Sequence, residues 1–158
     1  MSIDKFVSSM LRRVDTMIDS DVNHIIKFVP ELLLHNRYFK LFDFETATNL
    51  LSQWIMNNYD GRAEMNSVVR IDNKPVGYIS CKVQKDKLYI DLIAVHQDYQ
   101  HNGIGESLLN YAVKYANENK LDLLVKTQFD NYTALNFYIK NHFRLCSHYY
   151  ILNRVYKG

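Results

Sequence analysis

A chain of 158 residues is long enough for one sizeable hydrophobic core, so residues 1–158 are expected to form a single domain. An apolar content of 47% and an aromatic content of 13% exclude a disordered chain, and a formal net charge of +2 is too small to imply a nucleic-acid or membrane partner. No stretch approaches the ~20 apolar residues of a membrane span, and two cysteines in apolar runs, Cys81 and Cys146, indicate buried thiols in the cytoplasm instead of a disulfide framework.

The first predicted elements are a weak strand and a helix. Leu11 to Met17 favours a strand weakly, and residues 1–10 carry no pattern that places them. Asp19-Ser20-Asp21 is a helix-start signal, because such side chains accept hydrogen bonds from the free N–H groups of a first turn. Pro30 is expected to kink or end this helix after about 10 to 14 residues. The apolar residues at helical spacing are Val22, Ile25, Ile26 and Val29.

A second helix is predicted from Glu45 to Tyr59, with Asp60-Gly61 ending it. Trp54 has two interpretations. A lone tryptophan on an apolar helix face usually packs in the core, and the alternative is contact with a ligand. The apolar face of this helix consists of Ala47, Leu50, Leu51, Trp54 and Ile55.

The connection between these helices, residues 35–43, is aromatic and basic where a plain linker would be small and polar. Arg37 and Tyr38 are therefore candidate substrate contacts, because loops of this kind often carry them. The alternative is that Tyr38 closes the end of the core while Arg37 is solvated. His35 is a weak candidate for a general base.

Three apolar runs separated by short turns follow and predict an antiparallel meander: Met65 to Ile71, Pro75 to Val83 and Lys87 to Val95. Asp91 lies in the middle of the last run. A carboxylate in a central strand is costly unless it is paired or functional. Asp91 is therefore either hydrogen-bonded to a neighbouring strand or a general base.

The last of these strands leads into the glycine loop Gln100-x-x-Gly103-x-Gly105, and apolar residues then recur at helical spacing. Glycine lets the backbone approach a ligand closely, and the unpaired N–H groups of a first helical turn point outward with the positive end of the helix dipole. A pyrophosphate would fit there. His96 and His101 flank the loop without partners at metal-ligand spacing, so no metal site is expected.

Leu121 to Val125 is predicted to pair in parallel with the strand ending at Val95, because a helix crosses over between them. Asn131 begins a helix on which Asn131 and Tyr138 share one face. A final hairpin is expected from Phe143 to Ser147 and from Tyr149 to Val155. The predicted fold is mixed α/β, with about seven strands, namely a meander plus a parallel pair, and about four helices.

The glycine loop after its strand, together with Asn131-x-x-Ala134-x-x-x-Tyr138, resembles the motifs of the GNAT superfamily of acyl-CoA N-acyltransferases. The resemblance implies a GNAT fold whose parallel strands splay apart beyond Ala94, with acetyl-CoA as co-substrate in the opening. It further implies that backbone N–H groups near 93–95 polarise the thioester, that Asp91 relays a proton from the amine through water, and that Tyr138 protonates the leaving thiolate. The implied cofactor contacts are Ile93, Ala94, Val95, Gln100, His101, Asn102, Gly103, Ile104, Gly105, Asn131 and Tyr138.

The block 37–63, with Trp54-Ile-x-Asn57, and the segment Thr127-Gln128-x-x-Asn131 are similar to bacterial sugar-nucleotide N-acetyltransferases of the dTDP-fucosamine type. This second resemblance implies an amino-sugar nucleotide as the favoured acceptor, and Trp54 and Gln128 as further substrate contacts. Two alternatives stay open: a peptide or small-amine N-acetyltransferase, and a catalytically inert module that binds acyl-CoA as a sensor. The acyl chain is also open, and so is whether the chain forms a homodimer.

Overall fold

The computed structural model describes residues 11–33 and 41–148. The chain divides into two compact units, Met1–Lys126 and Thr127–Gly158, and each is described by itself. The first unit carries a β-sheet and the helices α2, α3 and α4, and the second carries α5. The organisation of residues 1–158 as one domain stays a prediction.

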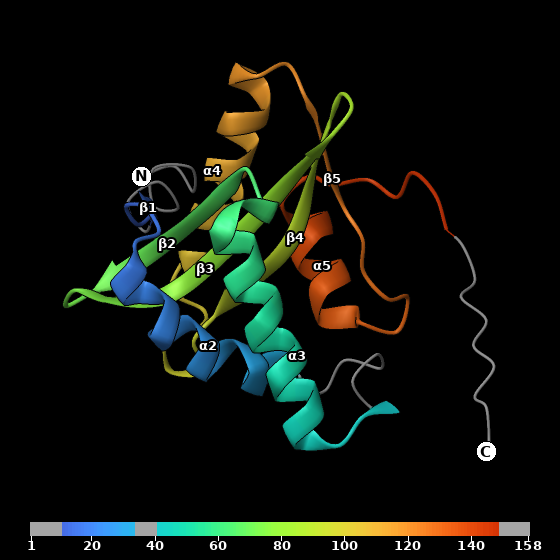
Figure 1. Ribbon diagram of the computed structural model, residues 1–158. Coiled ribbons are helices and arrows are strands. Elements are labelled where there is room, and N and C mark those ends of the chain that lie inside the picture. Colours follow the sequence, from blue (N-terminus) through green and yellow to red (C-terminus); the bar gives the residue numbers. More distant parts are fainter. Residues whose placement is uncertain (1–10, 34–40, 149–158) are drawn as a thin grey trace. The chain divides into compact units, whose positions relative to one another are not determined.

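A five-stranded sheet forms the centre of the first unit, with its strands in the order β1-β2-β3-β4-β5 (Figure 1). The strands from β1 to β4 pair antiparallel, and β5 pairs parallel to β4. The predicted meander and the predicted parallel strand are confirmed. The bounds are β1 Asp15–Thr16, β2 Met65–Ile71, β3 Lys74–Gln84, β4 Lys87–Val95 and β5 Asp122–Val125.

The turn between β2 and β3 shows why this hairpin forms. Asp72 and Asn73 have φ values of 50 and 60, the left-handed region that both central residues of a two-residue type I′ turn require. Aspartate and asparagine tolerate that region better than other side chains do. The turn sets a register in which Tyr78 points into the core beneath α2, whereas its neighbour Gly77 contacts α4 on the opposite face.

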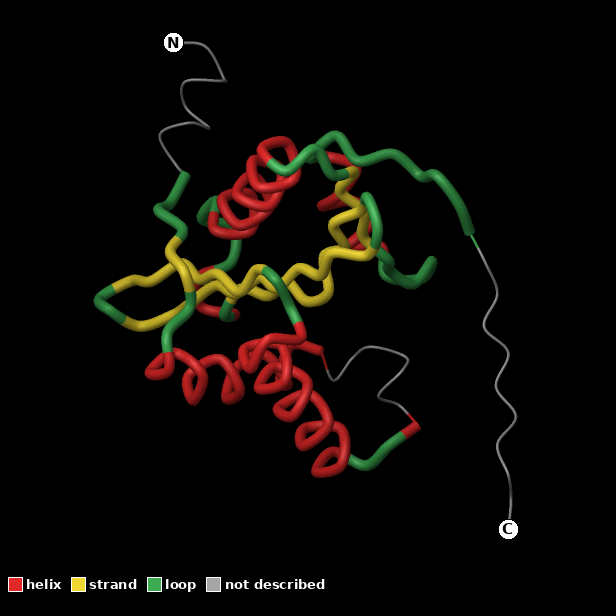
Figure 2. Tube along the Cα trace, turned by 45° about the horizontal axis from the view of Figure 1, so that its top comes forward, coloured by secondary structure: helices red, strands yellow, loops and turns green. Residues whose placement is uncertain are grey.

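Helices cover both faces of the sheet. Figure 2 shows α2 (Asp19–Leu33) and α3 (Phe44–Asn57) on one side of the strands and α4 (Ile104–Glu118) on the other. These amphipathic helices bury their apolar faces against the strands, which is the usual origin of a layered α/β fold. The core on the α2 side comprises Met17, Ile25, Phe28, Val29, Ile55, Val68, Tyr78, Leu92 and Ala94.

The two helices on this face differ from prediction in detail. α2 continues through Pro30 to Leu33, so the proline does not end it and the helix has 15 residues. Proline removes one backbone donor, and the buried neighbours Phe28 and Val29 provide packing that offsets this loss. Leu50, predicted on the buried face of α3, is 45% exposed.

α3 begins where Asp43 accepts a hydrogen bond from the N–H of Thr46 at 2.8 Å, an N-cap interaction. It ends in a π-helical turn, η2 (Asn58–Arg62), that contains Gly61 at φ 111. No neighbour lies within 4 Å of a Cβ placed on Gly61, so backbone conformation and not crowding selects glycine there. The predicted stop at Asp60-Gly61 is confirmed.

The prediction of about seven strands was wrong for the part of the chain that the structure describes, which forms five. Residues 143–148 form no strand, and the other half of the predicted hairpin, 149–155, lies outside the described residues. A strand is stable only with a hydrogen-bonded partner.

The helix α5 (Tyr132–Lys140) is followed by His142 in the left-handed region, with φ 69, a position at which glycine is usual. The N–H of Phe143 donates to the carbonyl of Tyr138 at 3.0 Å, which closes the end of the helix.

The two cysteines have different environments. Cys81 is buried in β3, and burial raises the pKa of its thiol to about 12, so the thiol stays protonated at neutral pH. Cys146 is exposed, contrary to prediction, because residues around it form no strand that would cover it. Only Cys81 is therefore a packing residue.

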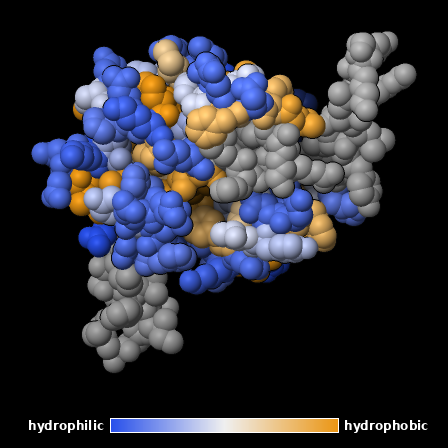
Figure 3. Space-filling model, turned by 90° about the horizontal axis from the view of Figure 1, so that it is seen from below, coloured by the Kyte–Doolittle hydropathy of each residue, from blue (hydrophilic) through white to orange (hydrophobic). Residues whose placement is uncertain are grey.

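Several large apolar side chains reach the surface near the start of α3, including Leu41 and Phe44, which are 58% and 66% exposed. The face seen from below in Figure 3 shows apolar groups in separate places among hydrophilic ones. Within the described ranges, each helix is too short or too polar to cross a membrane.

Substitution of Gly77 by alanine is expected to destabilise the fold by about 1–3 kcal/mol, because overpacking forces neighbours to shift. A Cβ on Gly77 would lie 2.6 Å from Cγ2 of Ile104 and 3.1 Å from Cδ1 of Leu108. Urea unfolding measures the effect. The double variant Gly77→Ala/Ile104→Ala should lose less stability than the sum of the two single variants, because the second change removes the clashing carbon. If the stability lost by the double variant equalled the sum of the losses of the two single variants, the close contact between β3 and the first residue of α4 would be contradicted.

Candidate functional site

A β-bulge interrupts β4 at Asp91. Ile90 pairs with Cys81 of β3 and Leu92 pairs with Ser80, so Asp91 is the extra residue with no partner opposite it. A bulge bends its strand and re-aims the side chains around it, and bulges are common beside active sites. Buried and partly exposed residues nevertheless alternate along the whole of β4.

β5 leaves β4 at the same place. The parallel ladder begins with Lys87 opposite Asp122 and ends with Ile90 opposite Val125. In the described part of the first unit, residues 91–95 have no strand on the side away from β3. The strands therefore part after Ile90 and not beyond Ala94, and the unpaired edge leaves backbone groups available to a ligand.

The carboxylate of Asp91 is held by three donors. Trp54 Nε1 and Asn58 Nδ2 donate to Oδ2 at 2.6 and 2.7 Å, and Lys82 Nζ lies 2.9 Å from Oδ1. The side chains of Lys82 and Asp91 are 15% and 14% exposed, so this is a mostly buried ion pair. Lys82 belongs to β3, so Asp91 is bonded to a neighbouring strand, which is one of its two predicted interpretations.

Neither Lys82 nor Asn58 was predicted from the sequence as a residue of this cluster. Lys82 is the only charged residue in the run from Pro75 to Val83, as Asp91 is in the run from Leu88 to Val95. Two lone opposite charges in adjacent antiparallel strands are a signal that they pair, because each would otherwise be buried without a partner. Asn58 is fully buried and donates to both Ser80 and Asp91, which no sequence pattern indicates.

Trp54, a predicted substrate contact, belongs to this cluster. The indole N–H of Trp54 donates its hydrogen bond to Asp91. The charged groups of Arg62 and Lys82 lie 5.6 and 5.8 Å from the centre of the Trp54 ring. Cations at this distance are attracted to the face of an indole ring. Trp54 therefore ties α3 and η2 to the bulge in β4.

The predicted glycine loop follows β4. The short helix η3 (Gln97–Tyr99) leads to Gly103, which has φ 74, and α4 begins at Ile104. Among the described residues, no side chain caps the N-terminus of α4, so the N–H groups of its first turn are free to meet an anion. The structure thus brings the loop residues 100–105 together at a helix N-terminus, as the sequence predicted.

Side chains around this loop bind backbone groups and give the loop a fixed shape. Gln100 Nε2 donates to the carbonyl of Val95 at 3.1 Å, and Asn102 Nδ2 donates to the carbonyls of Tyr99 and Gln100. The hydroxyl of Ser107 donates to the carbonyl of Gly103 at 2.7 Å. The loop is therefore organised before any ligand binds, which lowers the entropic cost of binding.

The second unit contains the other predicted cofactor contacts. Asn131 is the N-cap of α5, where its Oδ1 accepts a hydrogen bond from the N–H of Ala134 at 3.2 Å. The ring of Tyr138 packs between those of Phe137 and Phe143, at centroid distances of 5.3 and 5.4 Å. Gln128 precedes this helix. Arg37, Tyr38 and His35 lie outside the described residues.

Replacement of Asp91 by alanine is expected to cost about 2–4 kcal/mol of unfolding free energy, because Lys82 would keep a mostly buried charge without a counterion. Urea unfolding measures the loss. The matched control is Asp91→Leu/Lys82→Met, which removes both charges and should recover most of the stability. If the single and the double variant were equally stable, the ion pair would have no part in holding the bulge.

Comparison with known proteins gives one family and several relatives. The model described as the acetyltransferase (GNAT) family matches residues 32–143. The spore coat polysaccharide biosynthesis protein SpsD of Bacillus subtilis is 25% identical over 133 residues, which are 82% of this chain and 46% of that protein. Streptothricin acetyltransferase A of Bacillus subtilis is 44% identical over 55 residues, or 34% of this chain and 32% of that protein. The chain spans less than half the length of these two curated relatives.

Among solved structures, the PaiA N-acetyltransferase of Thermoplasma acidophilum, in complex with coenzyme A, superposes with a TM-score of 0.66. The match covers 82% of this chain and 87% of that one at 18% sequence identity. At this level of identity the likeness concerns the fold alone.

Proposed function

The chain belongs to the acetyltransferase (GNAT) family, and on that premise we propose that it transfers an acetyl group from acetyl-CoA to a primary amine. One observation carries the proposal: β4 loses its neighbour after Ile90 and then leads into an uncapped helix N-terminus at Gly103. An unpaired strand edge beside an anion-binding turn suits a ligand that has an amide-rich arm and a pyrophosphate.

Acetyl-CoA is the acyl donor of this family, and a solved relative holds coenzyme A. Its pyrophosphate would bind the N–H groups from Gly103 to Gly105, where the left-handed Gly103 keeps side-chain atoms away. Bound acetyl-CoA supplies an activated carbonyl with a thiolate leaving group. We assign Gln100, His101 and Asn102 to the same contact surface, and we assign Asn131 of the second unit as a further contact of the coenzyme.

The favoured acceptor is the amine of an amino-sugar nucleotide. Support comes from SpsD, whose name assigns it to polysaccharide biosynthesis and which aligns with most of this chain. Such an amine, deactivated by neighbouring sugar oxygens, should titrate near about 8 instead of the about 10.4 of a lysine side chain. Loss of its proton at neutral pH therefore needs only a weak base.

Residues of this chain have three roles in the proposed reaction. Backbone N–H groups near Ile93 to Val95 polarise the thioester carbonyl, because the β4 edge is unpaired there. Asp91 takes the proton of the amine through water, and its three donors fix the position of its carboxylate. Tyr138 holds a proton at its phenol oxygen for the leaving sulfur.

The test is release of free thiol from acetyl-CoA in the presence of a panel of amino-sugar nucleotides, polyamines and peptides. Turnover is expected with amino-sugar nucleotides above all. Faster turnover of lysine peptides would reassign the acceptor to the peptide class. Tight CoA binding without thiol release across the panel would overturn the enzyme and leave a module that binds acyl-CoA.

A further inference from the structure

The carboxylate of Asp91 has one open acceptor position. Trp54 Nε1 and Asn58 Nδ2 both donate to Oδ2, at 2.6 and 2.7 Å, whereas among the described residues Oδ1 receives only Lys82 Nζ, at 2.9 Å. Each oxygen of a carboxylate accepts about two hydrogen bonds, so Oδ2 is filled and Oδ1 can accept one more. The side chain of Asp91 is 14% exposed, so water can reach it. A water that relays the proton of the acceptor amine would therefore bind at Oδ1, beside Lys82.

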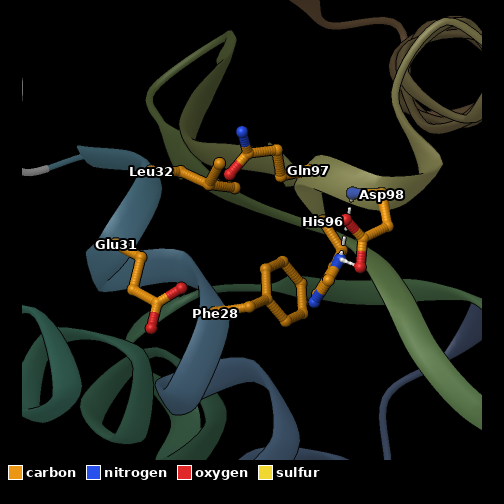
Figure 4. Close-up of a pocket in the computed structure, with 6 residues that line it drawn as sticks. All are labelled: Phe28, Glu31, Leu32, His96, Gln97 and Asp98. Carbon is orange, nitrogen blue, oxygen red and sulfur yellow. Dashed lines mark hydrogen bonds and ion pairs between the residues drawn. The ribbon is translucent and has the colours of Figure 1, made fainter.

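A second carboxylate follows β4, but it is not held in the same way. Figure 4 shows Asp98 beside His96 in the lining of a hollow that Phe28 and Glu31 of α2 also line. The side chain of Asp98 is 81% exposed, and Asp98 lies past the end of β4 in the chain. Water screens an exposed carboxylate from neighbouring charges. Asp91 is therefore the carboxylate whose protonation a neighbouring side chain can control.

Lys82 is the cation in contact with this carboxylate. Its side chain is 15% exposed, so the pair is mostly shielded from water. In such a pair an opposite charge favours the charged form of its partner. An ammonium group carries three N–H donors, and one of them serves Oδ1 of Asp91. The other donors of Lys82 can hold the oxygen of a water bound beside that atom.

The other titratable and charged groups around Asp91 leave this control to Lys82. Burial raises the pKa of Tyr78 and that of Cys81 to about 12, so both side chains on β3 are neutral at neutral pH. Glu64 is exposed, and its carboxylate accepts a backbone N–H of β3 at 2.7 Å. Two further cations lie over aromatic rings, Arg62 over Trp54 and Lys126 over Tyr89. Within the described part of the chain, only Lys82 forms an ion pair with Asp91.

We propose that Lys82 is a positioning residue of the acetyl transfer, which keeps Asp91 charged and holds the relay water at Oδ1. The proposal rests on the function proposed above. The water accepts the proton of the amine and passes one of its own protons to Oδ1, while the electron pair of the broken N–H bond stays on nitrogen and attacks the thioester carbonyl. Asp91 then becomes neutral and leaves the ammonium of Lys82 without a counterion, which favours return of the proton to solvent. Lys82 thus restores the base after each turnover.

The first test uses Trp54, which is the only tryptophan of the chain and donates to Asp91, so that its fluorescence reports the charge of that carboxylate. Its emission is titrated with acid over the pH range in which circular dichroism shows each protein to be folded. Lys82→Met should move the transition to higher pH, because a neutral neighbour no longer favours the charged carboxylate. The matched control Lys114→Met removes a positive charge from an exposed position on α4 and should leave the transition unchanged.

The double variant Asp91→Asn/Lys82→Met has neither charge and should show no transition. Lys82→Gln keeps an N–H donor without the charge, and it gives the same comparison if the methionine variant does not fold. Survival of the transition in the double variant would overturn the proposal. An equal midpoint with and without a charge at position 82 would overturn it as well.

The second test is the pH profile of kcat/KM for acetyl transfer. Lys82→Met should lower kcat/KM about 10-fold at about pH 5.5 and much less at about pH 9, where a carboxylate needs no neighbour to stay charged. Lys82→Arg should restore most of the loss because it returns the cation. An equal loss at both pH values, without recovery in Lys82→Arg, would leave Lys82 a purely structural role. If the unmodified protein acetylated no amine, the proposed function would fail, while the fluorescence titration would still decide whether Lys82 keeps Asp91 charged.

Discussion

Replacement of Tyr138 by phenylalanine is expected to lower kcat roughly 10²-fold and to leave the affinity for acetyl-CoA nearly unchanged. The leaving group is a thiolate, and a phenol positioned beside it can supply a proton as the bond to carbon breaks. Phenylalanine keeps the ring that packs between Phe137 and Phe143 and removes only the donor. The loss is at the low end for general acid catalysis because water can substitute in part.

The measurement is steady-state thiol release together with calorimetric binding of CoA. Phe137→Leu is a suitable control, because it changes the packing beside Tyr138 and keeps the hydroxyl. It should affect stability more than kcat. Full kcat in Tyr138→Phe, with thiol release shown to be at least partly rate-limiting, would reassign Tyr138 to packing.

Replacement of Gly105 by glutamate is expected to weaken CoA binding at least 10²-fold without unfolding the protein. A carboxylate about 4 Å from a pyrophosphate charge costs on the order of 4 kcal/mol at an effective dielectric constant of about 20. Gly105 lies inside α4 and, unlike Gly103, is not at positive φ, so a side chain there causes no backbone strain. Glutamate in a first helical turn even favours the helix through its dipole.

The variant Gly105→Ala separates the effect of the added charge on CoA affinity from the effect of the added side-chain volume. Alanine raises helix propensity by about 1 kcal/mol relative to glycine and adds one methyl group, so binding should fall less than 10-fold. Calorimetric titration with CoA and urea unfolding of both variants give the two quantities. Equal CoA affinity in a folded Gly105→Glu variant would place the pyrophosphate elsewhere.

Much of the fold could be read from neighbouring residues. The predicted turns Asp72-Asn73-Lys74 and Lys85-Asp86 placed the strands of the meander within a residue of their observed bounds, because a short hairpin turn limits which residues can pair. The loop from Gln100 to Gly105 was also readable, since a helix start depends on residues close to one another in sequence. The predicted strand from Phe143 to Ser147 does not form, and it could not be judged from its own residues because a strand needs a partner that they do not specify.

The sequence by itself predicted that β4 leads through a glycine loop into a helix N-terminus, and the structure confirms that helix start. Anion binding at this place stays a prediction. Only the tertiary structure decided what surrounds that strand. Asp91 is joined to Trp54, which lies 37 residues away in the sequence, and a one-residue bulge turns it toward Lys82. The contact of Asp91 with Trp54 depends on register and packing between distant segments, which the residues next to Asp91 in the chain do not specify.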